Sequence, residues 1–141
     1  MIYRQLLMTT YQNENTLFNR VFISGFKMIK LLHNNSCSKS RDVFNYLNEN
    51  NIEYELIDMV NEPLSAVEIK TVLHKLGIGI RDLVRTNEKI FVENYEGRDL
   101  SDDELLHLLE KHPELIQRPI VVKGSKAVIG RPLEKVKEFV E

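Results

Sequence analysis

The chain has 141 residues, which is enough for one globular domain that folds without disulfides or metals. Hydrophobic residues make up 43% of it and charged residues 28%, as in ordinary water-soluble domains. Nineteen Lys and Arg against 21 Asp and Glu leave a net charge of −2. This balance argues against a nucleic-acid binder, because such proteins need surplus positive charge. No apolar run approaches the roughly 18 residues of a membrane span, so we expect no membrane partner.

Residues 1–27 differ in charge from the rest. They hold three basic side chains and one acidic side chain, a net +2, whereas the remaining residues carry −4. Their apolar patches are shorter than the roughly 7–15 residues of a signal-peptide core. We therefore expect a flexible, dispensable N-terminal extension, or an upstream start, ahead of one domain over residues 28–141.

The first half of this domain shows a strand, a helix and a second strand. Met28–Leu32 is a short apolar run typical of a buried strand, and a polar loop follows at 33–36. A helix is expected from Ser38, and its apolar stripe consists of Val43, Phe44 and Leu47. Tyr54–Asp58 is predicted as the second strand, with Tyr54 and Leu56 facing inward and Ile57 a further candidate.

Two capping boxes mark helices in the middle of the chain. The first box, Ser65 with Glu68, opens a helix that Gly77 ends. The second box, Ser101 with Glu104, opens a helix that Pro113 stops. A short helical turn is expected between them, at 80–84.

The C-terminal part predicts a hairpin and a last helix. Ile120–Val122 and Ala127–Ile129 flank a four-residue turn, and a helix begins near Pro132. The order of elements predicts an α/β, thioredoxin-like (glutaredoxin-like) fold: a small mixed sheet, flanking helices and a central helical insertion.

The lone cysteine, Cys37, falls between the first strand and the first helix. One thiol excludes an intramolecular disulfide and a Cys-rich zinc site. At a helix N-terminus, free N–H groups and the helix dipole lower a thiol pKa and also attract anions. We therefore interpret Cys37 as a nucleophile in an oxyanion cradle. Arg41, four residues later, is interpreted as a solvated helix residue.

Other candidates surround this loop. His33 either stabilises the thiolate or only hydrogen-bonds the backbone, and both interpretations stay open. Arg118 precedes Pro119, a candidate for a cis peptide bond at a strand start. Arg131 lies in Gly-Arg-Pro after the last strand, and Arg85 follows the short turn. Arginines at loops near Cys37 would provide a multidentate grip on an oxyanion.

These segments together resemble the ArsC-type, glutaredoxin-dependent arsenate reductases. The resemblance covers 28–141 and rests on four motifs: His33–Arg41 (HNNSCSKSR), Leu83–Asn87, Gln117–Val122 and Gly130–Pro132. It implies that Cys37 attacks arsenate, that Arg85, Arg118 and Arg131 hold the oxyanion, and that His33 favours the thiolate. It also implies no bound cofactor or metal. Charge and length predict a monomer, and we expect it in the cytoplasm. Glutathione would attack the thiol-arsenate adduct, and glutaredoxin would then resolve the mixed disulfide.

The sequence departs from the family loop at Asn35, where the family has proline. The change removes no catalytic group but is expected to loosen the loop. Two alternatives share the fold. An Spx-like regulator that binds RNA polymerase usually has Cys-x-x-Cys, whereas Ser40 takes the second Cys position here. An ArsC-like thiol oxidoreductase without arsenate specificity is the other, and the three retained arginines favour the arsenate reductase over both.

Overall fold

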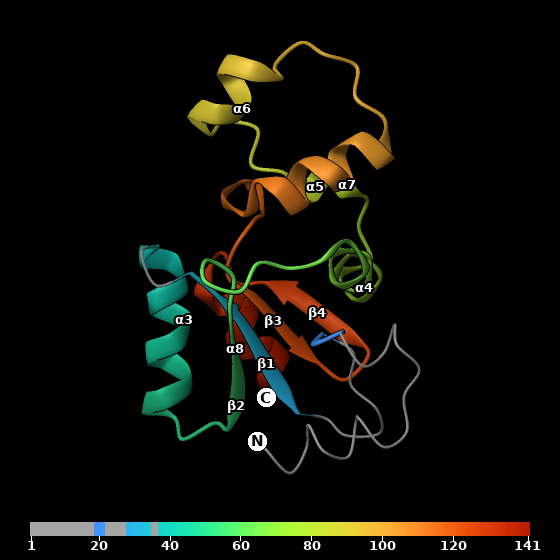
Figure 1. Ribbon diagram of the computed structural model, residues 1–141. Helices are drawn as coiled ribbons and strands as arrows, with labels where there is room; N and C mark the ends of the chain where they lie inside the picture. Colours follow the sequence, from blue (N-terminus) through green and yellow to red (C-terminus); the bar gives the residue numbers. More distant parts are fainter. Residues whose placement is uncertain (1–18, 22–27, 35–36) are drawn as a thin grey trace.

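The computed structural model describes residues 19–21, 28–34 and 37–141, and its centre is a four-stranded mixed sheet (Figure 1). The strand order is β2-β1-β3-β4. β1 pairs in parallel with β2 and antiparallel with β3, which forms a hairpin with β4. The strands are β1 (Ile29–His33), β2 (Tyr54–Asp58), β3 (Ile120–Lys123) and β4 (Lys126–Ile129).

Helices cover both faces of the sheet. On one face lie α3 (Ser38–Glu49) and α8 (Leu133–Val140), whose Val43, Leu47 and Val136 form a core with Leu31 and Val121. The other face carries α4 (Ala66–Leu76). The helical insertion extends this second layer away from the sheet (Figure 1). It comprises α5 (Ile80–Leu83), α6 (Lys89–Asn94), α7 (Asp102–Lys111) and the 3₁₀ turn η1 (Pro113–Leu115).

Local sequence signals account for most element ends. Ser65 and Ser101 each accept a hydrogen bond from the backbone of a glutamate three residues on, whose side chain accepts from the serine N–H. Both predicted capping boxes are therefore confirmed. Gly77 ends α4 with φ 69°, a conformation that favours glycine. The predicted fold class is confirmed as well.

The structure corrects three local predictions. Leu56 is 45% exposed, whereas Ile57 is buried. β2 is an edge strand: on its α3 face Tyr54 packs edge-on against Phe44 but Leu56 stays in solvent, whereas Ile57, on the alternate face, joins the core on the α4 side. His33 belongs to β1 rather than to the following loop. The short helix α6 was not predicted, because its six residues are too few to show an apolar period, and Ile90 and Phe91 are only partly buried.

Three residues of the extension, Asn19–Val21, form a strap that packs against the N-terminal turn of α4. Val21 is fully buried in the core on the α4 face. Arg20 donates from Nε and Nη2 to the two carboxylate oxygens of Glu68, at 2.8 and 3.0 Å. It also donates to the carbonyls of Glu62 and Pro63. The expectation of a flexible extension is therefore revised for these three residues, and the rest lies outside the described part of the chain.

The topology brings four chain segments to the same end of the sheet. β1, β2 and β4 end there, and β3 begins there. Gly130, directly after β4, donates its N–H to the Pro119 carbonyl at 2.8 Å. A Cβ at Gly130 would lie 3.0 Å from side-chain atoms of Pro119, Val43 and Val136. The loops bearing Cys37, Arg118 and Arg131 thus pack closely together at this end of the sheet.

In the part of the chain that the structure describes, the helices are all too short or too polar to cross a bilayer.

Candidate functional site

Cys37 is the N-cap residue of α3, with an extended backbone at φ −96° and ψ 124°. Its N–H donates to the Asn34 carbonyl at 3.0 Å, and its own carbonyl accepts from Arg41 N–H at 3.1 Å. Ser40, fully buried one turn into the helix, accepts from Asn34 N–H at 3.4 Å. These hydrogen bonds hold Asn34 and Cys37 against the first turn of α3, so the half-buried thiol has a defined position at the start of the helix.

The pKa of the Cys37 thiol is lowered from its usual value to about 7. Burial acts in the opposite direction and is the largest single influence. Hydrogen bonds from the backbone N–H groups of Ser40 and Lys39, together with a hydrogen bond and the charge from Arg118, outweigh it. The helix N-terminus therefore stabilises a thiolate, and about half of the thiol is ionised near neutral pH.

Arg131 contacts the sulfur directly. Its Nη2 lies 3.4 Å from Cys37 Sγ, and its Nε donates to the Arg118 carbonyl at 2.6 Å. The peptide bonds Arg118–Pro119 and Arg131–Pro132 are both cis. One guanidinium thus links the nucleophile to the second arginine loop, although 94 residues separate it from Cys37 along the chain.

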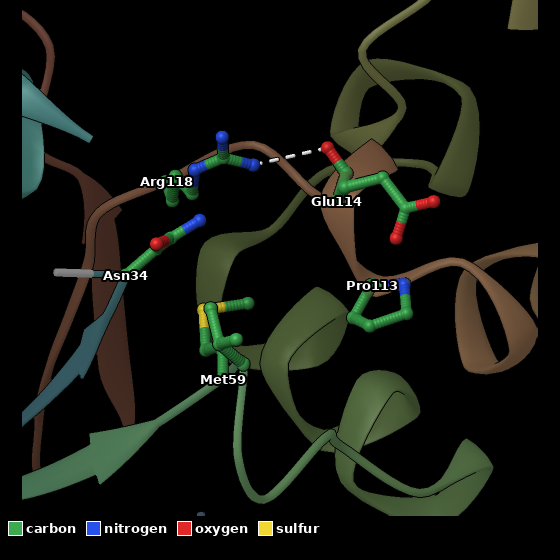
Figure 2. Close-up of a pocket in the computed structure, with 6 residues that line it drawn as sticks. Asn34, Met59, Pro113, Glu114 and Arg118 are labelled. Atoms are coloured by element: carbon green, nitrogen blue, oxygen red, sulfur yellow. Dashed lines mark hydrogen bonds between the residues drawn. The ribbon is translucent and has the colours of Figure 1, made fainter. Parts of the chain in front are cut away.

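Arg118 and Arg85 share one backbone acceptor. Both donate from Nη1 to the Glu114 carbonyl, at 3.0 and 3.3 Å, and Figure 2 shows the Arg118 contact. Arg85 is placed there by an antiparallel bridge between Val84 and Ile116, with Arg85 N–H donating to the Leu115 carbonyl at 2.7 Å. The helical insertion therefore places Arg85, the third arginine, on the same side of the molecule as Arg118 and the cysteine loop.

Positive charge exceeds negative charge at this site. Burial, then the charges of Arg118 and Arg131, lower the pKa of Arg85, whereas Glu88 and Cys37 raise it. Glu88 neutralises part of the Arg85 charge through a 2.5 Å ion pair. Arg118 Nε is buried and has no hydrogen-bond partner among the described residues. A buried donor without an acceptor is rare and indicates a place for an anionic or carbonyl oxygen.

His33 occupies a different position from the arginines. Its ring stacks on Phe44 with centroids 5.4 Å apart, and its carbonyl accepts from Met59 N–H at 2.9 Å. The ring is buried, and within the described segments Nδ1 has no hydrogen-bond partner. No hydrogen bond joins His33 to Cys37 in that part of the chain, so its role at the thiol stays a prediction.

Sequence reasoning singled out the four groups that lie together here, Cys37 and the three arginines, but missed their supports. Neither Glu88 nor the Glu114 carbonyl carries a sequence signal, because backbone acceptors are set by the fold. Lys39 and Arg41 are exposed. Asn35, where the loop departs from the family, lies outside the described residues. Those residues contain no cluster of three His, Cys, Asp or Glu side chains suited to a metal ion.

This chain is similar to the members of a known protein family. The model of the ArsC family matches residues 32–139. This chain belongs to the ArsC family. The Escherichia coli K12 protein YfgD is 40% identical over 116 residues, which cover 81% of this chain and 98% of YfgD. An arsenate reductase of Neisseria meningitidis serogroup A is 36% identical, over 77% of this chain and 94% of that protein.

A solved structure and a regulator are also similar to this chain. An arsenate reductase from Vibrio cholerae superposes with a TM-score of 0.74 at 35% identity, covering 81% of this chain and 98% of its own. The global transcriptional regulator Spx of Streptococcus pneumoniae R6 is 29% identical, over 79% of this ArsC-family chain and 85% of the regulator. The proteins that this chain resembles thus include enzymes and a regulator, so a choice between these functions must come from the site.

The lowered thiol pKa predicts how Cys37 reacts with an alkylating reagent. Because only the thiolate reacts, the rate should rise with pH and reach half its maximum near pH 7, against about 8.5 for a free cysteine. At pH 6 roughly a tenth of the limiting rate should remain. Iodoacetamide alkylation followed by mass spectrometry between pH 5 and 10 measures this. A midpoint near pH 8.5 would show that the thiolate of Cys37 is not stabilised.

Proposed function

We propose that this ArsC-family protein reduces arsenate to arsenite through Cys37, with glutathione and glutaredoxin as the reducing thiols. Arsenate is a tetrahedral oxyanion, and Arg85, Arg118 and Arg131 supply guanidinium donors that suit its oxygens. A cycle run by reducing thiols belongs in a reducing compartment, and we propose the cytoplasm. The enzyme acts without a bound cofactor or metal, as a monomer, and binds no nucleic acid or membrane.

The observation that carries this proposal is the contact between a cysteine with a lowered pKa and a guanidinium. Arg131 Nη2 lies 3.4 Å from Cys37 Sγ, close enough to hold an oxyanion bonded to that sulfur. The unpartnered Nε of Arg118 offers a second donor next to the same thiol. Donors placed in advance stabilise the charge that develops during attack, without reorganisation at that moment.

The first step forms a bond between sulfur and arsenic. The Cys37 thiolate attacks H₂AsO₄⁻, one As–O bond breaks, and the oxygen leaves as water after taking up a proton. The product is a Cys37–S–AsO₃H⁻ adduct in which arsenic is still As(V). The arginines stabilise its negative charge. In this proposal His33 favours the thiolate form from the end of β1.

The second and third steps move two electrons. A glutathione thiolate attacks Cys37 Sγ, the S–As bond breaks, and its electron pair stays on arsenic, which leaves as arsenite after protonation. Sulfur is oxidised to a Cys37–glutathione mixed disulfide. Glutaredoxin then attacks the glutathione sulfur, and the Cys37 thiolate is released. One enzyme cysteine suffices, in agreement with the single cysteine of the chain.

Arsenate-dependent NADPH oxidation tests the whole proposal. The assay couples the full-length protein to glutathione, glutathione reductase and glutaredoxin. Turnover should require arsenate, glutathione and glutaredoxin, each omitted in turn. Turnover with glutathione but no gain from glutaredoxin would overturn the proposed third step. No arsenate turnover from a folded protein with a reactive thiol would favour the thiol oxidoreductase or the regulator.

Replacing Arg131 with alanine should lower kcat/KM for arsenate by about 10²–10³-fold, as loss of one positioned oxyanion donor does. The alkylation midpoint of Cys37 should move little, because the Lys39 and Ser40 N–H groups remain. Arg41→Ala is the matched control, since it removes an exposed arginine from the first turn of α3, the helix that Cys37 caps. The coupled assay measures both variants. Equal arsenate kinetics for Arg131→Ala and Arg41→Ala would contradict the oxyanion role.

A further inference from the structure

An ion pair joins the oxyanion site to a carboxylate that the proposed reaction does not use. Arg85 Nη2 lies 2.5 Å from Glu88 Oε1, and the two side chains are 16% and 33% exposed. By contrast, Lys89 and Glu93 form a 3.8 Å ion pair whose side chains are 86% and 57% exposed. Water and salt screen a partly buried charge less than an exposed one. The charge of Glu88 therefore acts on its surroundings more strongly than that of Glu93.

The backbone keeps Glu88 against Arg85. Glu88 N–H donates to the Arg85 carbonyl at 3.2 Å, which closes a turn between the two residues. Glu88 is the N-cap residue of α6, a helix that the structure describes throughout, but its side chain makes no capping hydrogen bond there. The carboxylate therefore serves Arg85 rather than the helix.

Glu88 reduces the positive charge of the oxyanion site. Arg85, Arg118 and Arg131 carry three positive charges, whereas the Cys37 thiolate and Glu88 carry one negative charge each. The charges of the other two arginines, of the thiol and of Glu88 all act on the pKa of Arg85, so these groups interact with one another. With the thiolate formed, one positive charge remains for a ligand to balance.

A second carboxylate near the site does not change this balance. Glu114 lines a cavity of about 380 Å³ together with Arg118 and Met59. In Figure 2 its carboxylate points away from Arg118, and it lies 3.3 Å from His112 Nδ1. Of these two carboxylates, Glu88 is therefore the one that reduces the charge available to an anion.

An anion held by Arg85 is separated from the Glu88 carboxylate by one guanidinium. The repulsion between them grows in proportion to the charge of the anion. A singly charged oxyanion balances the remaining positive charge, whereas a doubly charged one leaves an uncompensated negative charge in a partly buried place, which is costly. Arsenate can meet this condition as H₂AsO₄⁻. Sulfate cannot, because it carries two charges at neutral pH.

We propose that Glu88 is a specificity-determining residue, whose carboxylate favours singly charged tetrahedral oxyanions at the arginines and disfavours doubly charged ones such as sulfate. The inference deepens the proposed function and rests on it, because it concerns the site at which H₂AsO₄⁻ would bind. Glu88 does not touch the reacting atoms in this scheme. It acts through Arg85, whose guanidinium it also holds in place.

Protection of Cys37 from iodoacetamide measures anion binding without turnover. Sulfate and methanesulfonate are the probes, because both are tetrahedral at sulfur but carry two charges and one. The full-length protein is alkylated at about pH 8, where the thiolate predominates, and at constant ionic strength. The anion concentration that halves the rate reports the affinity.

Glu88→Gln removes the charge but keeps a hydrogen-bond acceptor for Arg85. Sulfate should bind about tenfold more tightly to this variant than to the wild type, and methanesulfonate about threefold, because half the charge experiences half the change in binding free energy. In the coupled assay, the inhibition constant of sulfate against arsenate should fall about tenfold as well.

Glu93→Gln is the matched control. It removes the same charge from the same helix, but from an exposed ion pair, so both anion affinities should stay within about twofold of the wild type. A purely structural role for Glu88 predicts a different result, since a loosened Arg85 would bind both anions more weakly.

The outcomes separate this inference from the proposed function. Tighter sulfate binding to Glu88→Gln, without arsenate turnover in the wild type, would support the charge role and overturn the reductase. Arsenate turnover in the wild type, with equal sulfate affinity in Glu88→Gln and Glu93→Gln, would do the reverse. Weaker binding of both anions to Glu88→Gln would show that Glu88 only positions Arg85, and an equal gain for both would show that it does not select by charge. Either result would overturn the inference.

Discussion

Cys37→Ser is expected to abolish arsenate-dependent NADPH oxidation completely. A serine hydroxyl stays protonated near neutral pH, and no base hydrogen-bonded to position 37 lies among the described residues to activate it. The first step of the cycle then has no nucleophile. The coupled assay with glutathione and glutaredoxin measures the effect against the wild-type protein.

The fold should survive this replacement. Serine differs from cysteine by one atom, residue 37 is only half-buried, and serine is a favoured N-cap residue. Thermal unfolding should therefore show a change in stability of less than about 1 kcal/mol. Arsenate turnover above a tenth of the wild-type value from the folded variant would contradict the single-thiol mechanism. A partner bound equally well by the folded, inactive variant would instead support the regulatory alternative.

Arg20→Ala is expected to destabilise the protein by about 2–4 kcal/mol, although the residue lies far from Cys37 along the chain. Glu68 is 2% exposed, and its carboxylate accepts from Arg20 Nε, Nη2 and N–H. Removing the guanidinium leaves a buried carboxylate with the Ser65 N–H and backbone Arg20 N–H alone, and an uncompensated buried charge is costly. Urea unfolding at neutral pH measures the loss.

Two further variants separate charge from general disruption. Glu62→Gln removes the exposed partner of Arg20 and should cost less than about 1 kcal/mol. Glu68→Gln in the Arg20→Ala background should recover stability, because glutamine can keep the capping box without a buried charge. Equal stability of Arg20→Ala and the wild type would show that the strap does not hold the domain together.

The same pair predicts a pH dependence with a definite sign. Burial raises the pKa of Glu68, but hydrogen bonds from Arg20 and Ser65 outweigh this and lower it. A carboxylate with a lowered pKa stabilises the fold above its unfolded value of about 4.3, and this contribution disappears as pH falls through the folded pKa. The stability difference between wild type and Glu68→Gln should therefore shrink on acidification below about pH 4.

The sequence by itself determined most of the helices and strands, and it singled out the candidate reactive groups. Ser65 with Glu68 and Ser101 with Glu104 marked two helix starts, because capping depends on residues within one turn. The position of Cys37 between a strand and a helix indicated a stabilised thiolate. The motifs around Arg85, Arg118 and Arg131 pointed to the ArsC family, which the comparisons then showed.

Only the tertiary structure decided which groups support the site. Cys37 and Arg131 are 94 positions apart in the chain, and they come together only because the sheet aligns the ends of β1 and β4. The Glu114 carbonyl, the Arg20–Glu68 pair and the cavity beside Met59 all depend on contacts between distant segments. Leu56 was misassigned for a related reason: an edge strand and a covered strand share one alternating pattern, and only packing shows which side chains are covered.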